Sequence, residues 1–235
     1  MNSADYSVYR DQTLSKLFQT TLANSRTCRD CGEIVTETEL EAYIRIPVTT
    51  GGDEGLRQPT AYREDAASLK ELILATWNAH DEHGTCNSEE CTEARQLAEQ
   101  LESDVEDSGY DVIQRIKRGA DVLCIELGRN FFVDGEGIKR CDDVDYPDEL
   151  DLSEFTEDGL PLKYRLYGVS AHTGPNTFSG HYIAVVRHRN GREFRTINDD
   201  EVSRRGQTFE AALYPESYDT DFNPALLFYV KTEGK

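Results

Sequence analysis

Four of the six cysteines form two closely spaced pairs, a pattern typical of a metal site. Cys28 and Cys31 are separated by two residues and followed by Gly32, and Cys86 and Cys91 are separated by four. Four thiolates from two short pairs match the tetrahedral coordination of a structural zinc ion. One pair alone would equally suit a redox motif, and reduced, unrelated thiols are the alternative for all four. We expect a closed structural Zn²⁺ site that joins two hairpin tips distant in sequence.

The other two cysteines do not show such a pattern. Cys124 lies inside an apolar run and is expected to be a small core residue. Cys141 stands beside Asp142 and Asp143, whose charges would disfavour a thiolate. Neither is therefore expected to serve as a nucleophile.

A histidine at the start of an apolar strand could act as a base if a second residue oriented its ring. His181 opens the segment HYIAVV, and the later dipeptide Asn190-Gly191 is typical of a type I′ hairpin turn, in which both residues have positive φ. That turn would place Ile183 opposite Asn198. His181 and Asn198 would then be diagonal neighbours on one face of the hairpin.

The carboxamide of Asn198 could orient the imidazole of His181. We expect its oxygen to accept a hydrogen bond from Nδ1–H, which would fix the tautomer and leave Nε2 free for a nucleophile, as in Cys-His-Asn sites. The alternative is an ordinary surface histidine on a hairpin.

The elements that would position these residues combine few helices with many strands. Residues 14–22 could form a short helix, and residues 40–48 a strand near whose end Pro47 lies. Residues 92–109 are charged and weakly helical, as in a solvated insertion. From residue 122 onward, apolar strands alternate with turns. The predicted fold class is α+β with a mainly antiparallel sheet.

One helix has clear signals at its start and on its buried face. Ser68 and Glu71 have the spacing of a capping box at the beginning of segment 68–80. Its buried face would contain Leu69, Leu72, Ile73 and Trp77.

Composition narrows the class of protein. The 235 residues carry a net charge of -20, which argues against nucleic-acid binding because that binding requires neutralised phosphates. An acidic surface suits a basic partner, although it can also serve solubility alone. The sequence has no apolar run of membrane-spanning length and no secretory signal at its start, so we expect the cytoplasm or nucleus, where thiols stay reduced.

Several motifs, in order, resemble the catalytic domain of the ubiquitin-specific proteases, a papain-like family of deubiquitinating enzymes. The stretches YRLYGVSAHTG, FSGHYIAVVRH, FRTINDDEV and NPALLFYV are similar to its C-terminal half. VLCIELGRNFF and IKRCDDVDYPDELDL look like the strand pair and Tyr-Pro connection that precede it, and the segment containing CRDC resembles the entry to the family's fingers. The likeness runs from about residue 14 to 230.

The resemblance implies a papain-like palm with zinc-ribbon fingers. Residues 1–235 would form a partial domain, with fingers over about 24–118 and the palm over about 119–232. An N-terminal thumb would be missing. The two cysteine pairs match the family's zinc ligands at the fingers' tips.

The resemblance also assigns roles in the hairpin. His181 matches the general base, Asn198 the residue that orients it, and Asp199 the adjacent polar residue often counted with the site. The family's thiol lies in a box of the type Gly-x-x-Asn-x-Gly-Asn-x-Cys-Tyr-x-Asn, and here no cysteine precedes Cys28.

These matches imply cleavage of ubiquitin isopeptide bonds by the complete family domain and no hydrolysis by this chain alone. A non-catalytic ubiquitin-binding pseudoprotease is the alternative, followed by a zinc-stabilised interaction module. The expected partner is ubiquitin or a ubiquitinated protein, with no nucleic acid and no membrane.

Overall fold

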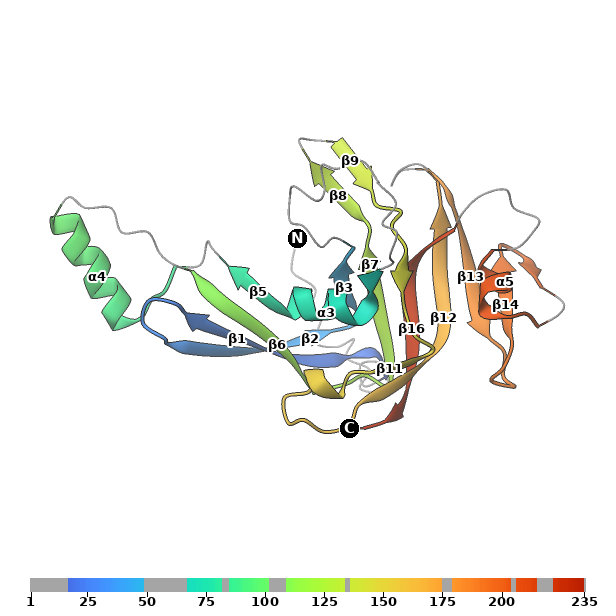
Figure 1. The fold of residues 1–235 in the computed structure, drawn as a ribbon, viewed down its shortest axis with the longest axis horizontal. Coiled ribbons are helices and arrows are strands. Elements are labelled where there is room, and N and C mark those ends of the chain that lie inside the picture. The colour runs from blue at the N-terminus through green and yellow to red at the C-terminus, as the bar shows by residue number, and fades with distance from the viewer. Residues whose placement is uncertain are drawn as a thin grey trace, which may run out of the picture.

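Two β-sheets set at an angle to each other make up most of the molecule (Figure 1). This computed structural model describes residues 17–48, 67–81, 85–101, 109–133, 136–174, 179–203, 206–214 and 222–234. We call the four-stranded sheet that reaches to the left in Figure 1 the extended sheet, and the eight-stranded one the central sheet. No helix within those residues is long and apolar enough to cross a membrane.

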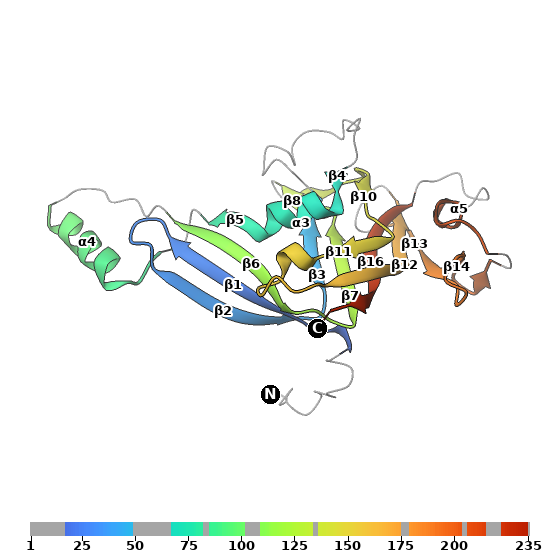
Figure 2. The same ribbon diagram turned by 60° about the horizontal axis from the view of Figure 1, so that its bottom comes forward.

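The extended sheet is entirely antiparallel, with strand order β2-β1-β6-β5. Its strands are β1 (Thr20–Cys28), β2 (Ile34–Glu41), β5 (Asn78–Asp81) and β6 (Tyr110–Arg118). The edge strand β2 is exposed along nearly its whole length. Glu37, Glu39 and Glu41 alternate along it, and such charges discourage pairing with another chain. Helix α4 (Glu89–Gln100) lies at the far end of this sheet (Figures 1 and 2).

The central sheet has the strand order β15-β14-β13-β12-β16-β7-β3, with β11 paired to β12. Its strands are β3 (Ile44–Pro47), β7 (Val122–Gly128), β11 (Glu149–Asp151), β12 (Lys163–Thr173), β13 (His181–Arg187), β14 (Phe194–Asn198), β15 (Glu201–Val202) and β16 (Asn223–Glu233). All neighbours are antiparallel except β3 and β7. The prediction of a mixed fold with mostly antiparallel sheets is confirmed.

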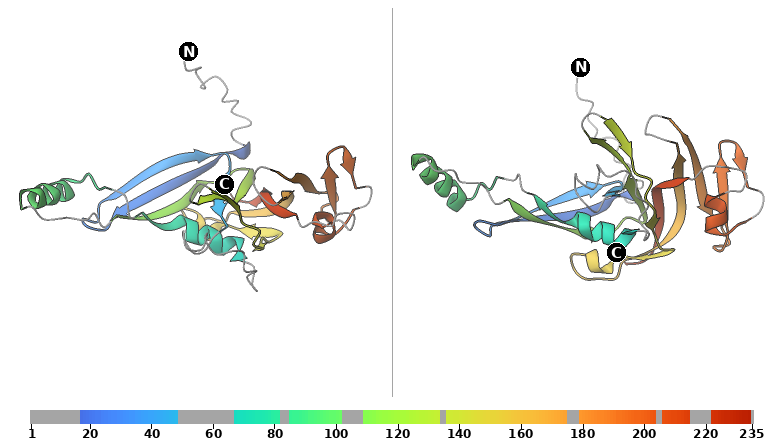
Figure 3. Two further views of the ribbon diagram at one scale, coloured as in Figure 1. Left: turned by 90° about the horizontal axis from the view of Figure 1, so that it is seen from above. Right: turned by 45° about the horizontal axis from the view of Figure 1, so that its top comes forward.

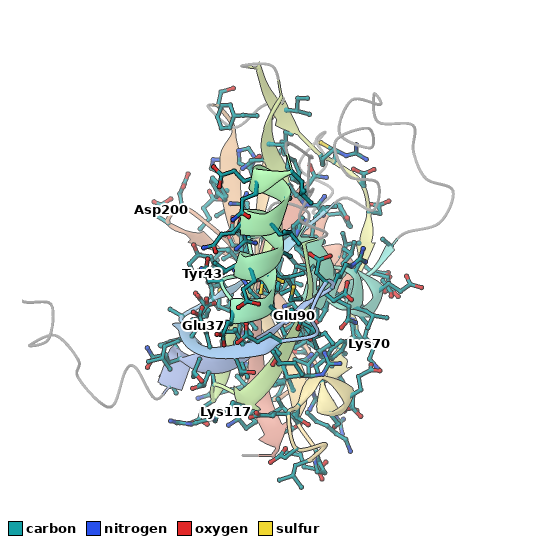
Figure 4. The ribbon with its side chains drawn as sticks, turned by 90° about the vertical axis from the view of Figure 1, so that its left-hand side faces the viewer. Glu37, Tyr43, Lys70, Glu90, Lys117 and Asp200 are labelled. Carbon is teal, nitrogen blue, oxygen red and sulfur yellow. The ribbon has the colours of Figure 1, made fainter. Side chains whose placement is uncertain are left out.

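Short elements flank these sheets. They are the hairpin of β8 (Asn130–Val133) and β9 (Glu136–Lys139), the parallel pair of β4 (Ala67–Ser68) and β10 (Val144–Asp145), the 3₁₀ helix η2 (Ser153–Phe155) and helix α5 (Phe209–Leu213). Figure 4 views the molecule from the α4 end, with Glu37 labelled on β2 and Asp200 labelled on the turn between β14 and β15.

Helix α3 (Leu69–Trp77) lies at the junction of the two sheets (Figures 2 and 3). The predicted capping box is present: the Glu71 amide donates to the Ser68 hydroxyl, and the Ser68 amide donates to the Glu71 carboxylate. All four residues predicted for its buried face are buried. The Trp77 ring meets Phe155 edge-on, with centroids 5.4 Å apart.

One cluster of buried apolar side chains runs from the base of the extended sheet into the central sheet. Leu22 of β1 and Ile116 of β6 belong to it together with Trp77, Leu123 and Leu227. The two sheets therefore share a core at their junction, whereas the outer part of the extended sheet depends on other contacts.

Three predictions of local structure were wrong in part. The helix expected over residues 68–80 ends at Trp77, and residues 78–80 belong to β5, which pairs with β6. The expected helix over residues 14–22 extends too far: Leu17 and Phe18 are helical, but Thr20 begins β1, whose β-branched threonines suit a strand. Residues 14–16 lie outside the described residues. The expected strand over 40–48 is divided between β2 and β3, which belong to different sheets, although Pro47 does end β3. The helical character expected beyond residue 92 is confirmed by α4.

Candidate functional site

The side chains of His181 and Asn198 meet at one end of the central sheet. His181 is the first residue of β13, and Asn198 is the last residue of β14. Imidazole Nε2 lies 2.5 Å from the carboxamide Oδ1, and both residues are half-buried. The structure thus brings together the two residues that the register predicted to be neighbours.

The ring orientation differs from the prediction. Nε2 of His181, rather than Nδ1, faces the Asn198 oxygen. Asn198 is diagonal to the histidine rather than opposite, and the outer nitrogen of the ring reaches further across that separation. With Nε2–H donating to Asn198, Nδ1 becomes the nitrogen with a free lone pair, and it makes no hydrogen bond with the described residues.

The hairpin has the expected register but a different turn. Ala184 pairs with Ile197, which extrapolates to Ile183 opposite Asn198. The His188 amide donates to the Glu193 carbonyl at 2.7 Å, so the loop spans the four residues 189–192. This loop has the same centre as the predicted two-residue loop, which is why the register is unchanged.

The type I′ prediction itself was wrong. Gly191 has φ 73°, but Asn190 is not among the described residues with positive φ. The Asn190 side-chain oxygen instead accepts from the amides of Arg192 and Glu193, at 3.1 and 3.3 Å. This local side-chain bonding stabilises the wider loop.

Asp199 occupies the tight turn between β14 and β15. Its φ of 52° makes it the one non-glycine residue with positive φ in the described part of the chain. Asn198 pairs with Glu201 across this turn, which fixes the end of β14 from which the Asn198 side chain projects. Aspartate tolerates the left-handed conformation better than most residues.

His172 is a neighbour to which the sequence gave no chemical role. It is buried, only 8% exposed, and its ring packs on Tyr182 with centroids 4.5 Å apart. Burial lowers the pKa of His172, and the charges of Lys139 and His181 lower it further. The sequence signal was the HTG motif at the end of the preceding strand, but motif and spacing do not reveal that this ring lies under the site.

The four paired cysteines converge on one point at the outer end of the extended sheet. Their sulfur atoms all lie within 4.8 Å of one another, with Cys28 and Cys91 3.8 Å apart and Cys31 and Cys86 3.7 Å apart. A tetrahedral zinc ion with Zn–S bonds of about 2.3 Å requires sulfur–sulfur separations of about 3.8 Å. The four residues therefore fit a zinc ion.

The two pairs are held by different local structures. In the first, Gly32 has φ 73° and its amide donates to the Cys28 carbonyl at 2.9 Å, which turns the chain so that both thiols face one side. The second pair lies at the start of α4, where Ser88 caps the helix through the Cys91 amide. The expectation of two hairpin tips was therefore wrong for the second pair.

The environment of these thiols is uneven. The hydroxyl and the backbone of Ser88 lower the pKa of Cys86 to about 6. At Cys91 the Ser88 hydroxyl also lowers the pKa, but burial and the neighbouring thiols outweigh it and raise the pKa to about 12. Metal binding must displace the protons from the buried thiols, so affinity at this site should fall with acidification.

All six cysteines are described, and none is within hydrogen-bonding distance of His181. Cys124 lies on β7, where burial and then the charge of Glu126 raise its pKa to about 11. Cys141 is exposed beyond β9. The hairpin thus presents an imidazole that is hydrogen-bonded to a carboxamide, with no thiol beside it among the described residues.

Comparison with known proteins gives one family. A family model described as "Ubiquitin carboxyl-terminal hydrolase" matches residues 2–229. Human ubiquitin carboxyl-terminal hydrolase 42 is 33% identical over 119 residues, which cover 50% of this chain and 8% of that protein. Ubiquitin carboxyl-terminal hydrolase 13 of Saccharomyces cerevisiae is 24% identical over 177 residues, which cover 74% of this chain and 20% of that protein.

Solved structures share the fold. A SAGA DUB module bound to monoubiquitin matches with a TM-score of 0.68 and 19% identity, over 94% of this chain and 42% of the other. A yeast SAGA DUB module matches with a TM-score of 0.69 and 18% identity, over 100% of this chain and 47% of the other. The chain thus spans less than half the length of each of these relatives.

Proposed function

The chain belongs to the ubiquitin carboxyl-terminal hydrolase family, and from this premise we propose that it carries the base half of a thiol-hydrolase site for ubiquitin conjugates. His181 is the general base, and Asn198 holds its ring. Asp199, in the adjoining turn, holds the end of β14 in place. The bond to be cleaved is the isopeptide bond that follows the C-terminal glycine of ubiquitin.

The proton transfers follow from the ring orientation. Nε2–H donates to Asn198, so Nδ1 is the atom that takes a proton from an attacking thiol and later delivers it to the leaving amine. The fixed hydrogen bond keeps the imidazole in one tautomer and one orientation through both transfers. The single observation that carries the proposal is the 2.5 Å contact between His181 Nε2 and Asn198 Oδ1.

The thiol itself is not assigned to this chain. Four cysteines cluster around one point in the extended sheet, and the other two do not contact His181 in the described residues. We therefore propose that these 235 residues alone bind without hydrolysing.

In this proposal the extended sheet corresponds to zinc-bearing fingers within about residues 24–118. The central sheet corresponds to a palm over about 119–232, to which β3 (Ile44–Pro47) adds an edge strand. Cys28, Cys31, Cys86 and Cys91 would hold one structural Zn²⁺. The ion would have a structural role and cross-link strand β1 to helix α4. It would have no catalytic role, because four protein ligands leave no open position for a reacting group. The sulfur–sulfur distances support this ligand set.

Ubiquitin is the proposed partner. The family's name and the fold shared with a ubiquitin-bound module support it, and the net charge of -20 favours a partner with basic side chains. None of the six cysteines forms a disulfide, which is consistent with the cytoplasm or nucleus as the proposed location.

A second function is favoured by the absence of a thiol beside His181 in the described residues. In it the chain is a ubiquitin-binding pseudoprotease whose palm and fingers serve recognition alone. Both functions require ubiquitin binding, whereas a zinc-stabilised scaffold of another kind does not.

Titration with mono-ubiquitin tests the binding that both functions share. We expect saturable binding by calorimetry or NMR, weakened as salt is raised because a charged interface is screened. His181→Ala is the matched variant: it removes the base but should leave the affinity within about twofold. A flat titration up to about 1 mM ubiquitin would contradict the proposed function.

A further inference from the structure

We propose that Lys139 is a positioning residue whose ammonium group holds the end of strand β12 and thereby fixes the backbone on which His181 is presented. The inference rests on the proposed function only in giving His181 the role of base. The geometry on which it stands belongs to the free chain.

Lys139 contacts the backbone immediately beside the histidine's strand partner. It is the last residue of β9, and its Nζ donates to the Gly174 carbonyl at 3.0 Å and to the His172 carbonyl at 3.4 Å. These two carbonyls flank Thr173, the residue paired with His181 in the last rung between β12 and β13. The ammonium group therefore binds the carbonyls on both sides of Thr173, the residue that pairs with His181.

The sheet does not supply this support by itself. Strand β16 begins at Asn223, opposite His172, so the Gly174 carbonyl lies beyond the end of that pairing. The β8–β9 hairpin lies near this end of β12 in Figure 1 and delivers the lysine to it. A charged donor forms stronger hydrogen bonds than a neutral one. The Lys139 ammonium can therefore hold the Gly174 carbonyl where β16 does not pair with it.

The backbone at this point is closely packed, so a displacement of β12 would be passed on to β13. A Cβ at Gly174 would lie 2.4 Å from the Ser179 carbonyl oxygen, and one at Gly180 would lie 2.1 Å from the Thr173 carbonyl oxygen. Both glycines also have positive φ, 137° and 154°. The two strands thus touch backbone to backbone directly before His181.

The ring of His172 closes the remaining space. A Cβ at Gly180 would lie 2.2 Å from Nε2 of His172, and the His172 ring also packs against the Tyr182 ring. Gly180 and Tyr182 are the residues directly before and after His181, and both contact the His172 ring. Lys139 in turn binds the His172 carbonyl. Lys139, His172 and the glycine contact form a continuous path to the imidazole.

The test uses the unbound chain and ¹⁵N NMR of the histidine rings and backbone amides. In the unmodified chain the neutral His181 ring should carry its proton mainly on Nε2. Lys139→Met keeps the aliphatic stem but removes the donor. We expect it to lower the Nε2–H preference severalfold and to raise amide exchange at Thr173 and His181 about tenfold.

Two variants separate positioning from general stability. Lys139→Arg retains charge and donors and should restore both signals. Lys231→Met is the matched control, since Lys231 also binds a backbone carbonyl, that of Gly119 at 2.9 Å, at another end of the central sheet. It should leave the His181 ring and the exchange at Thr173 unchanged.

The proposal is overturned if Lys139→Met leaves the tautomer ratio and local exchange at the unmodified values, or if Lys231→Met shifts them equally. Should Lys139→Met not fold, Lys139→Gln is measured in its place, with an intermediate shift expected and no shift contradicting the proposal. None of these readouts involves ubiquitin. A flat ubiquitin titration with the expected NMR changes would therefore reject the proposed function and leave the role of Lys139 intact.

Discussion

The imidazole of His181 has one nitrogen engaged by Asn198 and the other available, the condition that a directional base requires. The pairing could be predicted from sequence because a hairpin register follows from turn position and strand alternation. Which nitrogen faces Asn198 could not, since it depends on the side-chain torsions of both residues. The four thiols were predictable for a related reason: short spacing brings each pair together whatever the surrounding fold.

Replacing Asn198 tests the residue-scale assignment. Asn198→Ala removes the acceptor for Nε2–H, so the two neutral tautomers of His181 should become more equally populated, at a cost of about 1 kcal/mol in unfolding free energy. Ring ¹⁵N shifts and urea unfolding measure the two effects. Asn190→Ala, in the loop at the other end of the hairpin, should leave the tautomer unchanged; an unchanged tautomer in Asn198→Ala would refute the orienting role.

His172 makes a pH prediction of defined sign. Burial lowers its pKa in the folded state below the ordinary value near 6.5, so the unfolded chain binds more protons as the pH falls. Stability from this residue is intact above about pH 7 and is lost as the pH falls through the ordinary value toward the lowered one.

Urea midpoints at pH 5, 6 and 7 check this prediction. His172→Phe keeps a ring against Tyr182 but does not titrate, so it should lose less stability on acidification than the unmodified chain. Equal losses in the two proteins would mean that His172 is not buried as described.

Helix α4 and strand β1 are the elements that build the thiol site. The start and the buried face of helix α3 could be predicted, since its cap and its apolar spacing are local signals. Its end could not, because residues 78–80 form β5 by pairing with β6. The start of β1 could not be predicted, because the apolar spacing of residues 14–22 suits a helix, whereas pairing with β2 and β6 makes the chain a strand from Thr20 onward. The division between β2 and β3 likewise depends on which sheet each strand joins.

Ser88 joins the helix cap to the thiol site. Ser88→Ala removes the hydrogen bond to the Cys91 amide and the hydroxyl that lowers the pKa of Cys86. We expect the stability of α4, measured by amide exchange, to fall by about 1 kcal/mol. Metal affinity, measured by chelator competition, should also fall. The matched control is Ser68→Ala, which removes the cap of α3 and should not alter metal affinity. Equal metal affinity in both variants would contradict the link.

At the scale of the whole molecule, two separate clusters of buried side chains stabilise different regions. The large one joins the central sheet, α3 and the base of the extended sheet. The small one contains Cys28, Cys86, Cys91 and Tyr110, and it stands alone at the outer end. Because this cluster is small, it buries little apolar area. A bound metal ion would therefore supply much of the stability at the outer end of the extended sheet.

Metal removal should therefore act locally. After chelation we expect faster amide exchange in residues 28–33, 89–100 and 110–112, while β12, β13 and β16 keep their protection. Exchange measured by mass spectrometry resolves the two regions. Uniform loss of protection would mean that the outer end and the central sheet unfold as one unit, and no change would remove the metal assignment.

We propose that this chain holds a general base, His181, and its orienting residue, Asn198, with no thiol beside them among the described residues. The decisive experiment is incubation with a ubiquitin–fluorophore substrate at a concentration that saturates binding. We expect no release of fluorophore above the rate seen with His181→Ala. A measurable rate that His181→Ala abolishes would contradict it, because a nucleophile of this chain would then be working with that imidazole.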